Sequence, residues 1–332
     1  DTCSMDDADI RGLIDVNAGS TNSMDDWYGA SASFYNFGIT NSLRCNRADT
    51  GDLRYTPGSN SGQKHTISFW LKRSELSTTH GQRLFKSSYN THIKFNASDD
   101  LTVSLRAESA IDETNGLSDL VITTNRLFRD TSAWYNIVIA IDTTQGTAAN
   151  RVKIYVNGVQ ETSFSASAYP SQNHYVQGFS TSATILLGGQ SPDNAEYFGG
   201  YMADINMIFG TAYAATSFGE FKNDIWIPKD TSGLTFGNQG FRYEMKQTGT
   251  SANSSGIGAD TSGQGNHATL AGSGFLGTDI VTDSPSNNFA TLNIGMRANL
   301  TISEGSLKVV GVAQNFDNMA GTIAFDPTDS RG

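Results

Sequence analysis

The sequence contains little cysteine: Cys3 and Cys45 are the only two among 332 residues. Two cysteines are too few for a disulfide framework, and their spacing is not that of a metal site. Because nothing else in the sequence indicates a disulfide-permissive compartment, we expect two unpaired thiols, with a Cys3–Cys45 bridge as the alternative.

Charged residues are also scarce, at 17% of the chain, and no run of 18 or more apolar residues occurs. Long surface helices normally need Glu, Lys and Arg in quantity, so the composition favours β-structure with polar turns. A membrane-spanning helix needs about 20 apolar residues, and the acidic N-terminal residues lack the basic and apolar regions of a signal peptide. The sequence therefore predicts neither membrane insertion nor a signal peptide.

Basic residues are outnumbered, with 22 Lys and Arg against 33 Asp and Glu, which gives a formal charge of −11. Such a charge repels phosphate backbones, so we expect no nucleic-acid partner. Hydrophobic residues still make up 37% of the chain and aromatic residues 10%. That is enough apolar surface for at least one packed core.

Short apolar segments separated by Gly, Asn, Asp and Ser predict an antiparallel all-β domain. Residues 65–72 alternate and predict a strand with one core face, whereas residues 134–142 are apolar on both faces and predict a central strand. Asn157-Gly158 suits the positive φ angles of a type I′ hairpin. Further strands are expected at residues 83–86, 92–95, 101–106, 120–124, 183–187 and 200–209, and a short helix at 213–221.

The pattern changes along the chain and predicts four parts. Residues 1–29 are acidic and turn-rich, and we interpret them as an N-terminal arm. Residues 30–229 are predicted to form the sandwich. Residues 230–293 are interpreted as a Gly/Ser-rich connector with one short strand at 240–245, and residues 294–332 as the start of a further β module or an inter-subunit β segment.

Four segments in order resemble the laminin-G-like, concanavalin-A-like jelly roll. They are the strand at residues 66–73, WYNIVIAID at 134–142, the hairpin at 153–160 and the strand at 198–208. The resemblance implies an all-β, two-sheet antiparallel jelly-roll sandwich. Loops at the ends of two packed sheets are well placed for binding, because the hydrogen-bonded core holds them in position.

A narrower set of segments resembles jelly-roll proteins of tailed bacteriophages: SFWLKRS, IVIAIDTTQGTAANRVKIYVNGVQETSF, GEFKNDIWIPK, GADTSGQGN and DSPSNNFATLN. This resemblance implies a virion structural protein, assembled in the host cytoplasm, on a tail fibre or related appendage. Its expected partners are other virion proteins, copies of itself and host-surface glycan. The alternatives are a capsid decoration or head-fibre protein without a receptor role, and a polysaccharide depolymerase.

Catalytic residues find little support in the sequence. A glycoside hydrolase on this fold needs two carboxylates flanking the scissile bond. The nearest cluster, Glu108, Asp112 and Glu113, lies among Asn, Gly and Ser and is interpreted as a solvated loop. The five histidines have no metal-type spacing. We therefore expect no enzyme activity.

Asp193, Asn194 and Glu196 are the candidate calcium ligands, because carboxylate and amide oxygens are the ligands that Ca²⁺ prefers. No ligand spacing distinguishes this loop from others, so an ordinary polar loop is the favoured interpretation and no cofactor is expected. Asp204 is expected to be a hydrogen-bonded structural carboxylate. The stretch 260–263 is expected to form a capped turn.

The candidate binding loop is AYPSQNHYVQGF at residues 168–179. Its Tyr169, Asn173, His174, Tyr175 and Phe179 combine aromatic rings, which stack on sugar faces, with polar groups that hydrogen-bond to hydroxyls. The competing interpretation is a loop packed against its own sandwich or another subunit. Trp70 and Trp134 are expected to lie in the core, since they belong to strong strands.

Overall fold

The computed structural model describes residues 34–59, 62–76, 79–87, 91–105, 120–179, 183–189, 196–272, 274–294, 300–311 and 320–322. The chain divides into two units, residues 1–36 and 37–332, and the strands among the described residues belong to the second. Across the described ranges, no helix has the length and apolar character needed to cross a membrane.

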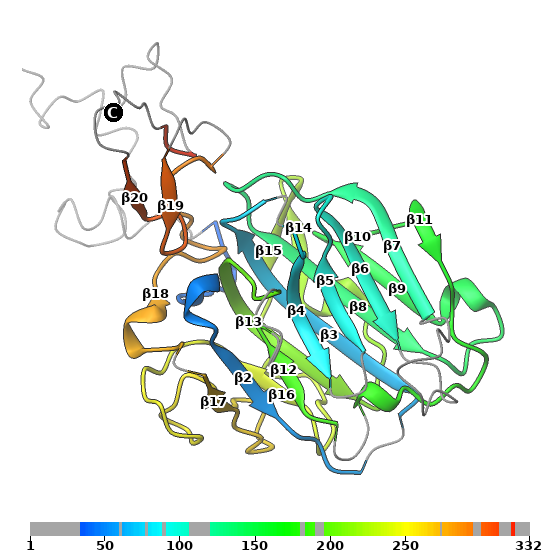
Figure 1. Cartoon of the computed structure of the whole chain (residues 1–332). Helices are drawn as coiled ribbons and strands as arrows, with labels where there is room; N and C mark the ends of the chain where they lie inside the picture. Colours follow the sequence, from blue (N-terminus) through cyan, green and yellow to red (C-terminus); the bar gives the residue numbers. More distant parts are fainter. Residues whose placement is uncertain are drawn as a thin grey trace, which may run out of the picture. The chain divides into compact units, whose positions relative to one another are not determined.

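The second unit is built around two antiparallel sheets of eight strands each (Figure 1). The first sheet has the order β10 (Val159–Gln160), β9 (Val152–Val156), β8 (Tyr135–Asp142), β3 (Lys64–Arg73), β13 (Gly200–Phe209), β1 (Ser42–Cys45) and β18 (Ile280–Val281), with β16 (Phe241–Tyr243) also paired to β13. The second has the order β11 (Phe164–Ser167), β7 (Leu120–Leu127), β6 (Asp100–Leu105), β5 (His92–Phe95), β4 (Gln82–Ser87), β12 (Ile185–Leu187), β2 (Asp52–Tyr55) and β17 (Thr269–Ala271).

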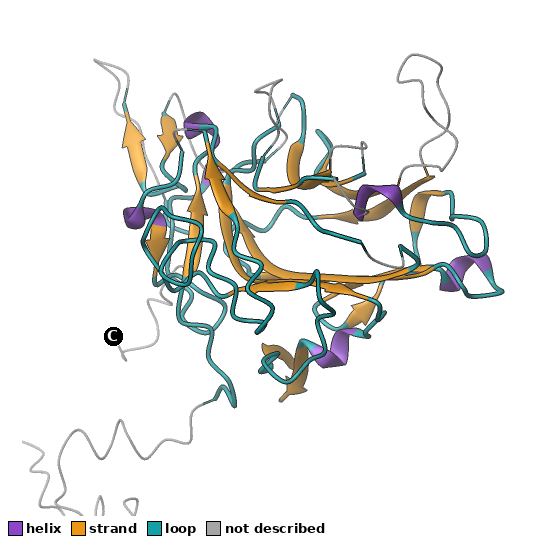
Figure 2. Cartoon of the chain, turned by 90° about the horizontal axis from the view of Figure 1, so that it is seen from below, coloured by secondary structure: helices purple, strands orange, loops and turns teal. Residues whose placement is uncertain are grey.

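The two sheets face each other as layers (Figure 2) and enclose the main core. Alternate residues of β3, including Ile67, Phe69 and Leu71, point into it, as the alternation predicts. β8 contributes Ile137 and Ile139 from the same side. The predicted all-β, two-sheet antiparallel sandwich is therefore confirmed, and the period-2 pattern of its central strands is the physical reason for it.

A second hydrophobic cluster covers the opposite face of the first sheet. Trp70, Trp134 and Val138 lie there and pack against Phe218 and Trp226. Trp226 belongs to a small antiparallel pair of strands, β14 (Gly219–Lys222) and β15 (Ile225–Pro228), and Phe218 directly precedes β14. Trp70 and Trp134 are core residues, as expected. The expectation that residues 65–72 bury only one face is wrong, because this additional layer removes the other face from water.

The hairpin between β9 and β10 forms as predicted. Val156 and Val159 are paired, so only Asn157 and Gly158 lie between the strands. Their φ angles are 47° and 80°, and positive φ at both central residues is what a type I′ turn requires.

The helix expected at residues 213–221 is wrong. Only a single 3₁₀ turn, η5 (Ala215–Ser217), forms, and β14 begins two residues later. The turn at Asn223 and Asp224, with φ angles of 50° and 62°, folds β14 onto β15. Cross-strand pairing of this hairpin over the Trp-rich face outweighs the weak helical pattern.

The segment expected to be a connector, residues 230–293, contributes strands to both sheets. β16 pairs with β13, β18 with β1, and β17 with β2. Its apolar side chains, among them Phe236, Phe241, Tyr243, Ile257 and Phe275, are buried. They are spaced too widely for a strand pattern to be visible in the sequence. The last pair of described strands is β19 (Thr301–Ser303) with β20 (Lys308–Val310).

Candidate functional site

One end of the first sheet carries an ordered polar rim, defined here as residues 62–64, 142–151 and 168–176. β3 begins where β8 ends, since Lys64 and Asp142 are register partners. The loop after β8 starts at this end of the first sheet, and the loop after β11, an edge strand of the second sheet, is hydrogen-bonded to it between Asn173 and Thr143. This topology brings the predicted binding loop next to residues that lie about thirty and about a hundred positions earlier.

Hydrogen bonds between these loops fix the predicted binding loop. The Asn173 amide donates to the Thr143 carbonyl over 2.8 Å, and the Thr143 hydroxyl donates to the His174 carbonyl over 2.7 Å. The Gln63 side chain donates to the Asn173 carbonyl over 3.2 Å, and Gln172 donates to the Thr144 carbonyl over 3.1 Å. A loop held by so many backbone contacts presents its side chains in fixed positions.

Arg151, which directly precedes β9, connects the two loops. Its guanidinium donates to the carbonyls of Gln145, Gly146 and Pro170 over 2.8, 2.9 and 2.8 Å. Charge-assisted bonds to carbonyls are stronger than neutral ones, and a planar guanidinium holds three acceptors in a fixed geometry. Arg151 is therefore a positioning residue for the rim.

Asp142 is the acidic group of the rim. Partial burial opposes its ionisation, but hydrogen bonds from Thr144 and Gln145, together with the nearby Lys64, lower the pKa of Asp142. Its carboxylate accepts from the Thr144 amide, the Thr144 hydroxyl and the Gln145 side chain, and lies 3.4 Å from the Lys64 ammonium. Asp142 is thus an ionised, fully hydrogen-bonded loop anchor.

The five predicted binding residues do not all face the solvent. Asn173 is exposed, and Tyr169 and Tyr175 are partly exposed. His174 and Phe179 are buried at 5% and 2% exposure, and the Phe179 ring packs against His65. The structure thus brings Tyr169, Asn173 and Tyr175 to the surface of the rim, whereas His174 and Phe179 hold the loop in place. Ligand binding by this set stays a prediction.

Several residues of the rim are not identified as functional by the sequence pattern. Gln63, Asp142, Thr143 and Arg151 position the loop, and none of them lies within it. The run Asp142-Thr143-Thr144 at the end of a strong strand was the available signal. An Asp followed by hydroxyl residues commonly forms an Asx-turn, in which the carboxylate accepts the amide two residues on.

Of the three candidate calcium ligands, only Glu196 is among the described residues. Asp193 and Asn194 are outside the described residues, and Glu196 forms ion pairs with Arg83 and, at 3.0 Å, with Lys94. Despite partial burial, these two cations lower the pKa of Glu196. Among the residues that can be described, no three His, Cys, Asp or Glu side chains gather closely enough to hold a metal.

Two further sequence candidates also fall outside the described residues. These are the carboxylate cluster Glu108, Asp112 and Glu113, and the first cysteine, Cys3. Cys45 is a free and buried thiol in β1. Burial raises the pKa of the Cys45 thiol well above its usual range, so it stays protonated and unreactive.

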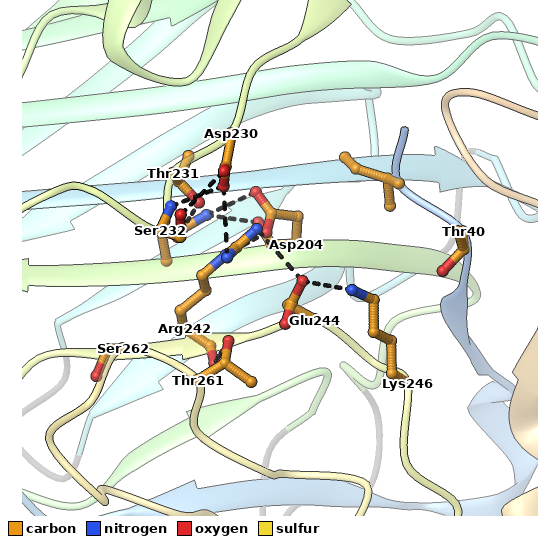
Figure 3. A network of polar contacts seen from close by, with 12 residues as sticks. Thr40, Asp204, Asp230, Thr231, Ser232, Arg242, Glu244, Lys246, Thr261 and Ser262 are labelled. Atoms are coloured by element: carbon orange, nitrogen blue, oxygen red, sulfur yellow. Dashed lines mark hydrogen bonds and ion pairs between the residues drawn. The ribbon is translucent and has the colours of Figure 1, made fainter. Parts of the chain in front are cut away.

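A second polar network lies on the outer face of β13 and β16 (Figure 3). A register shift between Ala203 and Asn206 turns Asp204 outward with a φ of 42°, and Arg242 reaches it over 3.0 Å. Arg242 also lies 3.4 Å from Glu244. Burial raises the pKa of Asp204, although Arg242 opposes that shift. Asp204 is therefore a structural carboxylate, as expected.

The cavity beside this network is too small for a sugar. It measures about 10 Å³ and is lined by Phe37, Thr40, Glu244 and their neighbours. That volume accommodates roughly one water molecule. The turn at residues 260–263 lies nearby and is confirmed as a capped turn, since Asp260 accepts from the Ser262 amide over 2.8 Å and its hydroxyl over 2.9 Å.

Comparison with protein families matches residues 47–215 to the model described as the concanavalin A-like lectin/glucanases superfamily. No curated protein matches the chain. Among solved structures, a putative carbohydrate binding protein from Bacteroides ovatus is 13% identical, with a TM-score of 0.48, 71% of this chain covered and 59% of that chain. The heptameric SAP-like pentraxin from Limulus polyphemus is 15% identical (TM-score 0.36, 54% and 80% covered).

The enzymatically active domain of tailspike protein 2 from bacteriophage CBA120 is 11% identical, with a TM-score of 0.36, 53% of this chain covered and 26% of that chain. The family match is the more informative finding, because it runs from η2 (Arg47–Asp49) to the start of η5. The matched range thus contains β2 through β13 and the whole polar rim.

Proposed function

The chain belongs to the concanavalin A-like lectin/glucanase superfamily, and we propose that it is a non-enzymatic carbohydrate-binding module whose polar rim binds glycan on a bacterial surface. The finer part of the proposal is that a bacteriophage virion carries the module, on a tail fibre or related appendage. Other virion proteins and copies of the same chain would be its partners there.

The observation that carries the proposal is the fixed exposure of polar and aromatic groups on the rim. Gln172 and Asn173 are exposed, and both are hydrogen-bonded to the loop after β8, Asn173 through its backbone amide and Gln172 through its side chain. Tyr169 and Tyr175 present partly exposed rings beside them. Sugar recognition needs rings that stack on apolar sugar faces and rigid polar groups that bond to hydroxyls.

The charges of the rim favour a neutral glycan. Asp142 is neutralised by Lys64 at 3.4 Å, and the Arg151 guanidinium is occupied by three carbonyls. An acidic polymer would find no uncommitted cation among these groups, and the net charge of −11 would repel it. Neutral hexose-containing polysaccharide is therefore the expected ligand class.

The virion assignment is supported by the five sequence segments that resemble tailed-bacteriophage jelly-roll proteins. Two of them map onto elements that build the binding module: IVIAIDTTQG contains the end of β8 and the first loop of the rim, and GEFKNDIWIPK forms the β14–β15 pair. Immunogold labelling of particles tests the location. Label on the tail supports the proposal, and label on the head supports a capsid decoration protein without a receptor role.

The binding proposal is tested on an array of neutral and acidic bacterial polysaccharides with the purified chain. We expect binding to neutral glycans, weakened at least tenfold by Gln172→Ala combined with Asn173→Ala. Gln160→Ala, on an exposed strand at the hairpin end of the first sheet, is the matched control and should bind as the unmodified chain does. Unchanged binding by the rim variant contradicts the proposed site.

Absence of any glycan binding contradicts the proposed function as a whole. Release of reducing ends from a bound polysaccharide, abolished by Glu108→Gln, would instead establish a depolymerase.

A further inference from the structure

A fully buried lysine lies beneath the segment that follows β18. Lys72 is on the β3 face that points away from the main core, and its side chain is 1% exposed. Its Nζ lies 3.0 Å from Asp283 Oδ2, 2.8 Å from the carboxamide oxygen of Asn288 and 2.7 Å from the Phe289 carbonyl. An amine, a carboxylate and a primary carboxamide therefore meet at one atom.

The amine and the carboxylate of this group are buried, and the Asn288 carboxamide lies at the exposed edge of the site. The Trp134 indole donates to Asp283 Oδ1 over 3.2 Å, and the Phe289 amide donates to the same oxygen over 3.3 Å. The Tyr201 ring lies 5.8 Å from Lys72 Nζ. The Asn288 amide nitrogen donates to the Ser132 carbonyl over 2.8 Å. The carboxamide is thus held at both ends, with its carbonyl directed to the amine.

This environment makes it easier for the Lys72 ammonium to lose a proton than it is in water. Burial lowers the pKa of Lys72, although the Asp283 carboxylate opposes that shift. A neutral amine is a nucleophile, whereas an ammonium is not. A nucleophile held against an acyl group has an effective concentration far above any that free reactants reach. A slow exchange of one amide for another can therefore go to completion, because each chain has to react only once.

We propose that Lys72 and Asn288 form an intramolecular isopeptide bond, with Asp283 as the proton carrier. Lys72 gives a proton to Asp283, and the neutral Nζ attacks Cγ of Asn288. The Nζ–Cγ bond forms and the Cγ–Nδ2 bond breaks. Asp283 returns this proton to Nδ2, which leaves as ammonia, and then takes up the second proton that Nζ loses as the new amide forms, so that atoms and charges balance and no oxidant or cofactor is needed.

The bond would join strands far apart in the chain. Lys72 and Asn288 are 216 positions apart, so the crosslink ties the central strand β3 to the segment after the edge strand β18. A covalent link across a long loop restricts the unfolded chain, as a disulfide does, but it resists reduction. Such a link suits a module that has no disulfide at Cys45 and, under the proposed function, would bear mechanical load on a particle.

Mass spectrometry of the full chain tests the bond directly. The folded protein should be lighter than its sequence mass by about 17 Da, the mass of one ammonia. Trypsin should not cleave after Lys72, and fragmentation should show the peptide containing Lys72 joined to the peptide containing Asn288. A full sequence mass overturns the proposal. So does a loss of ammonia confined to a linear peptide, which would indicate a succinimide at an asparagine.

Matched variants separate the chemistry from folding. Asn287→Ala removes the adjacent asparagine, whose side chain makes only an exposed contact with the Thr282 carbonyl, and should keep the crosslink. Asn288→Ala and Lys72→Met should abolish it. Asp283→Asn should retain the circular dichroism spectrum while the crosslinked fraction falls at least tenfold. A crosslink that forms equally well in Asp283→Asn contradicts the assigned proton carrier.

Discussion

The indole ring of Trp226 lies flat against Gly158, so close that a Cβ at Gly158 would stand 2.4 Å from the ring. The same indole donates to Asn136 Oδ1 over 3.1 Å, and the Asn136 backbone N–H donates to Asn157 Oδ1 over 2.7 Å. The β14–β15 pair is thereby joined to the type I′ hairpin at the edge of the first sheet. Glycine at position 158 serves both the turn and this contact.

Replacing Gly158 with valine should destabilise the protein by at least about 1 to 3 kcal/mol, because a β-branched residue is forced to positive φ and also collides with the Trp226 ring. Urea denaturation measures the loss. Gly233→Val is the control, since a Cβ at Gly233 meets nothing within 4 Å. Equal midpoints for the two variants would contradict the described contact.

His65 should make the stability depend on pH. It is enclosed by the rings of Phe179 and Phe209, and burial lowers the pKa of His65 to about 4. Between that value and about 6.5 the unfolded chain binds a proton that the folded chain does not, so stability falls as pH falls through this window, by up to about 3 kcal/mol.

Comparing urea midpoints at pH 7 and pH 4.5 tests the role of His65. His65→Leu should lose part of the pH dependence in this window, whereas the exposed His80→Leu should keep all of it. The account of His65 fails if the pH dependence is the same in both variants.

Arg151→Ala should loosen the rim without unfolding the sandwich. It removes three hydrogen bonds from a charged donor to the carbonyls of Gln145, Gly146 and Pro170, and we expect a loss of about 1 to 3 kcal/mol. Hydrogen exchange should become faster in residues 168–176. Lys153→Ala, on the neighbouring strand β9, is the control and should leave that exchange unchanged.

The Asp204–Arg242 pair offers a contrast between buried and exposed charges. Arg242→Met leaves Asp204 buried without its cation, and removing one partner of a buried pair typically costs about 3 to 5 kcal/mol. Lys246→Met breaks only the ion pair with Glu244, in which the Lys246 side chain is 45% exposed. It should lower the free energy of unfolding by about 1 kcal/mol or less. Thermal unfolding of both variants measures the difference, and equal losses would contradict the burial of Asp204.

The sequence sufficed for the elements whose signal is local. Asn157-Gly158 specifies its turn because both residues readily adopt positive φ. Residues 134–142 predict a central strand because they are apolar on both faces. The layer of side chains that packs over Trp70 could not be predicted. Its members Phe218, Trp226 and Phe236 come from a separate segment, and their spacing matches neither a helix nor a strand. Their partners are set by tertiary packing.

The rim was predictable only in part for a similar reason. The composition of residues 168–179 indicates a binding loop, but which side chains reach the surface depends on contacts such as that between Gln63 and Asn173, 110 positions apart. Phe179 looks like a contact residue in the sequence and is instead packed against His65. Aromatic residues in a long loop serve its anchoring as readily as its binding.

The most direct test of the account is amide chemical-shift mapping of the isotope-labelled protein during titration with a neutral polysaccharide that it binds on the array. The account predicts saturable shifts concentrated in residues 142–151 and 168–176. Shifts confined to the second sheet or to the β14–β15 pair, or none at all, would contradict it.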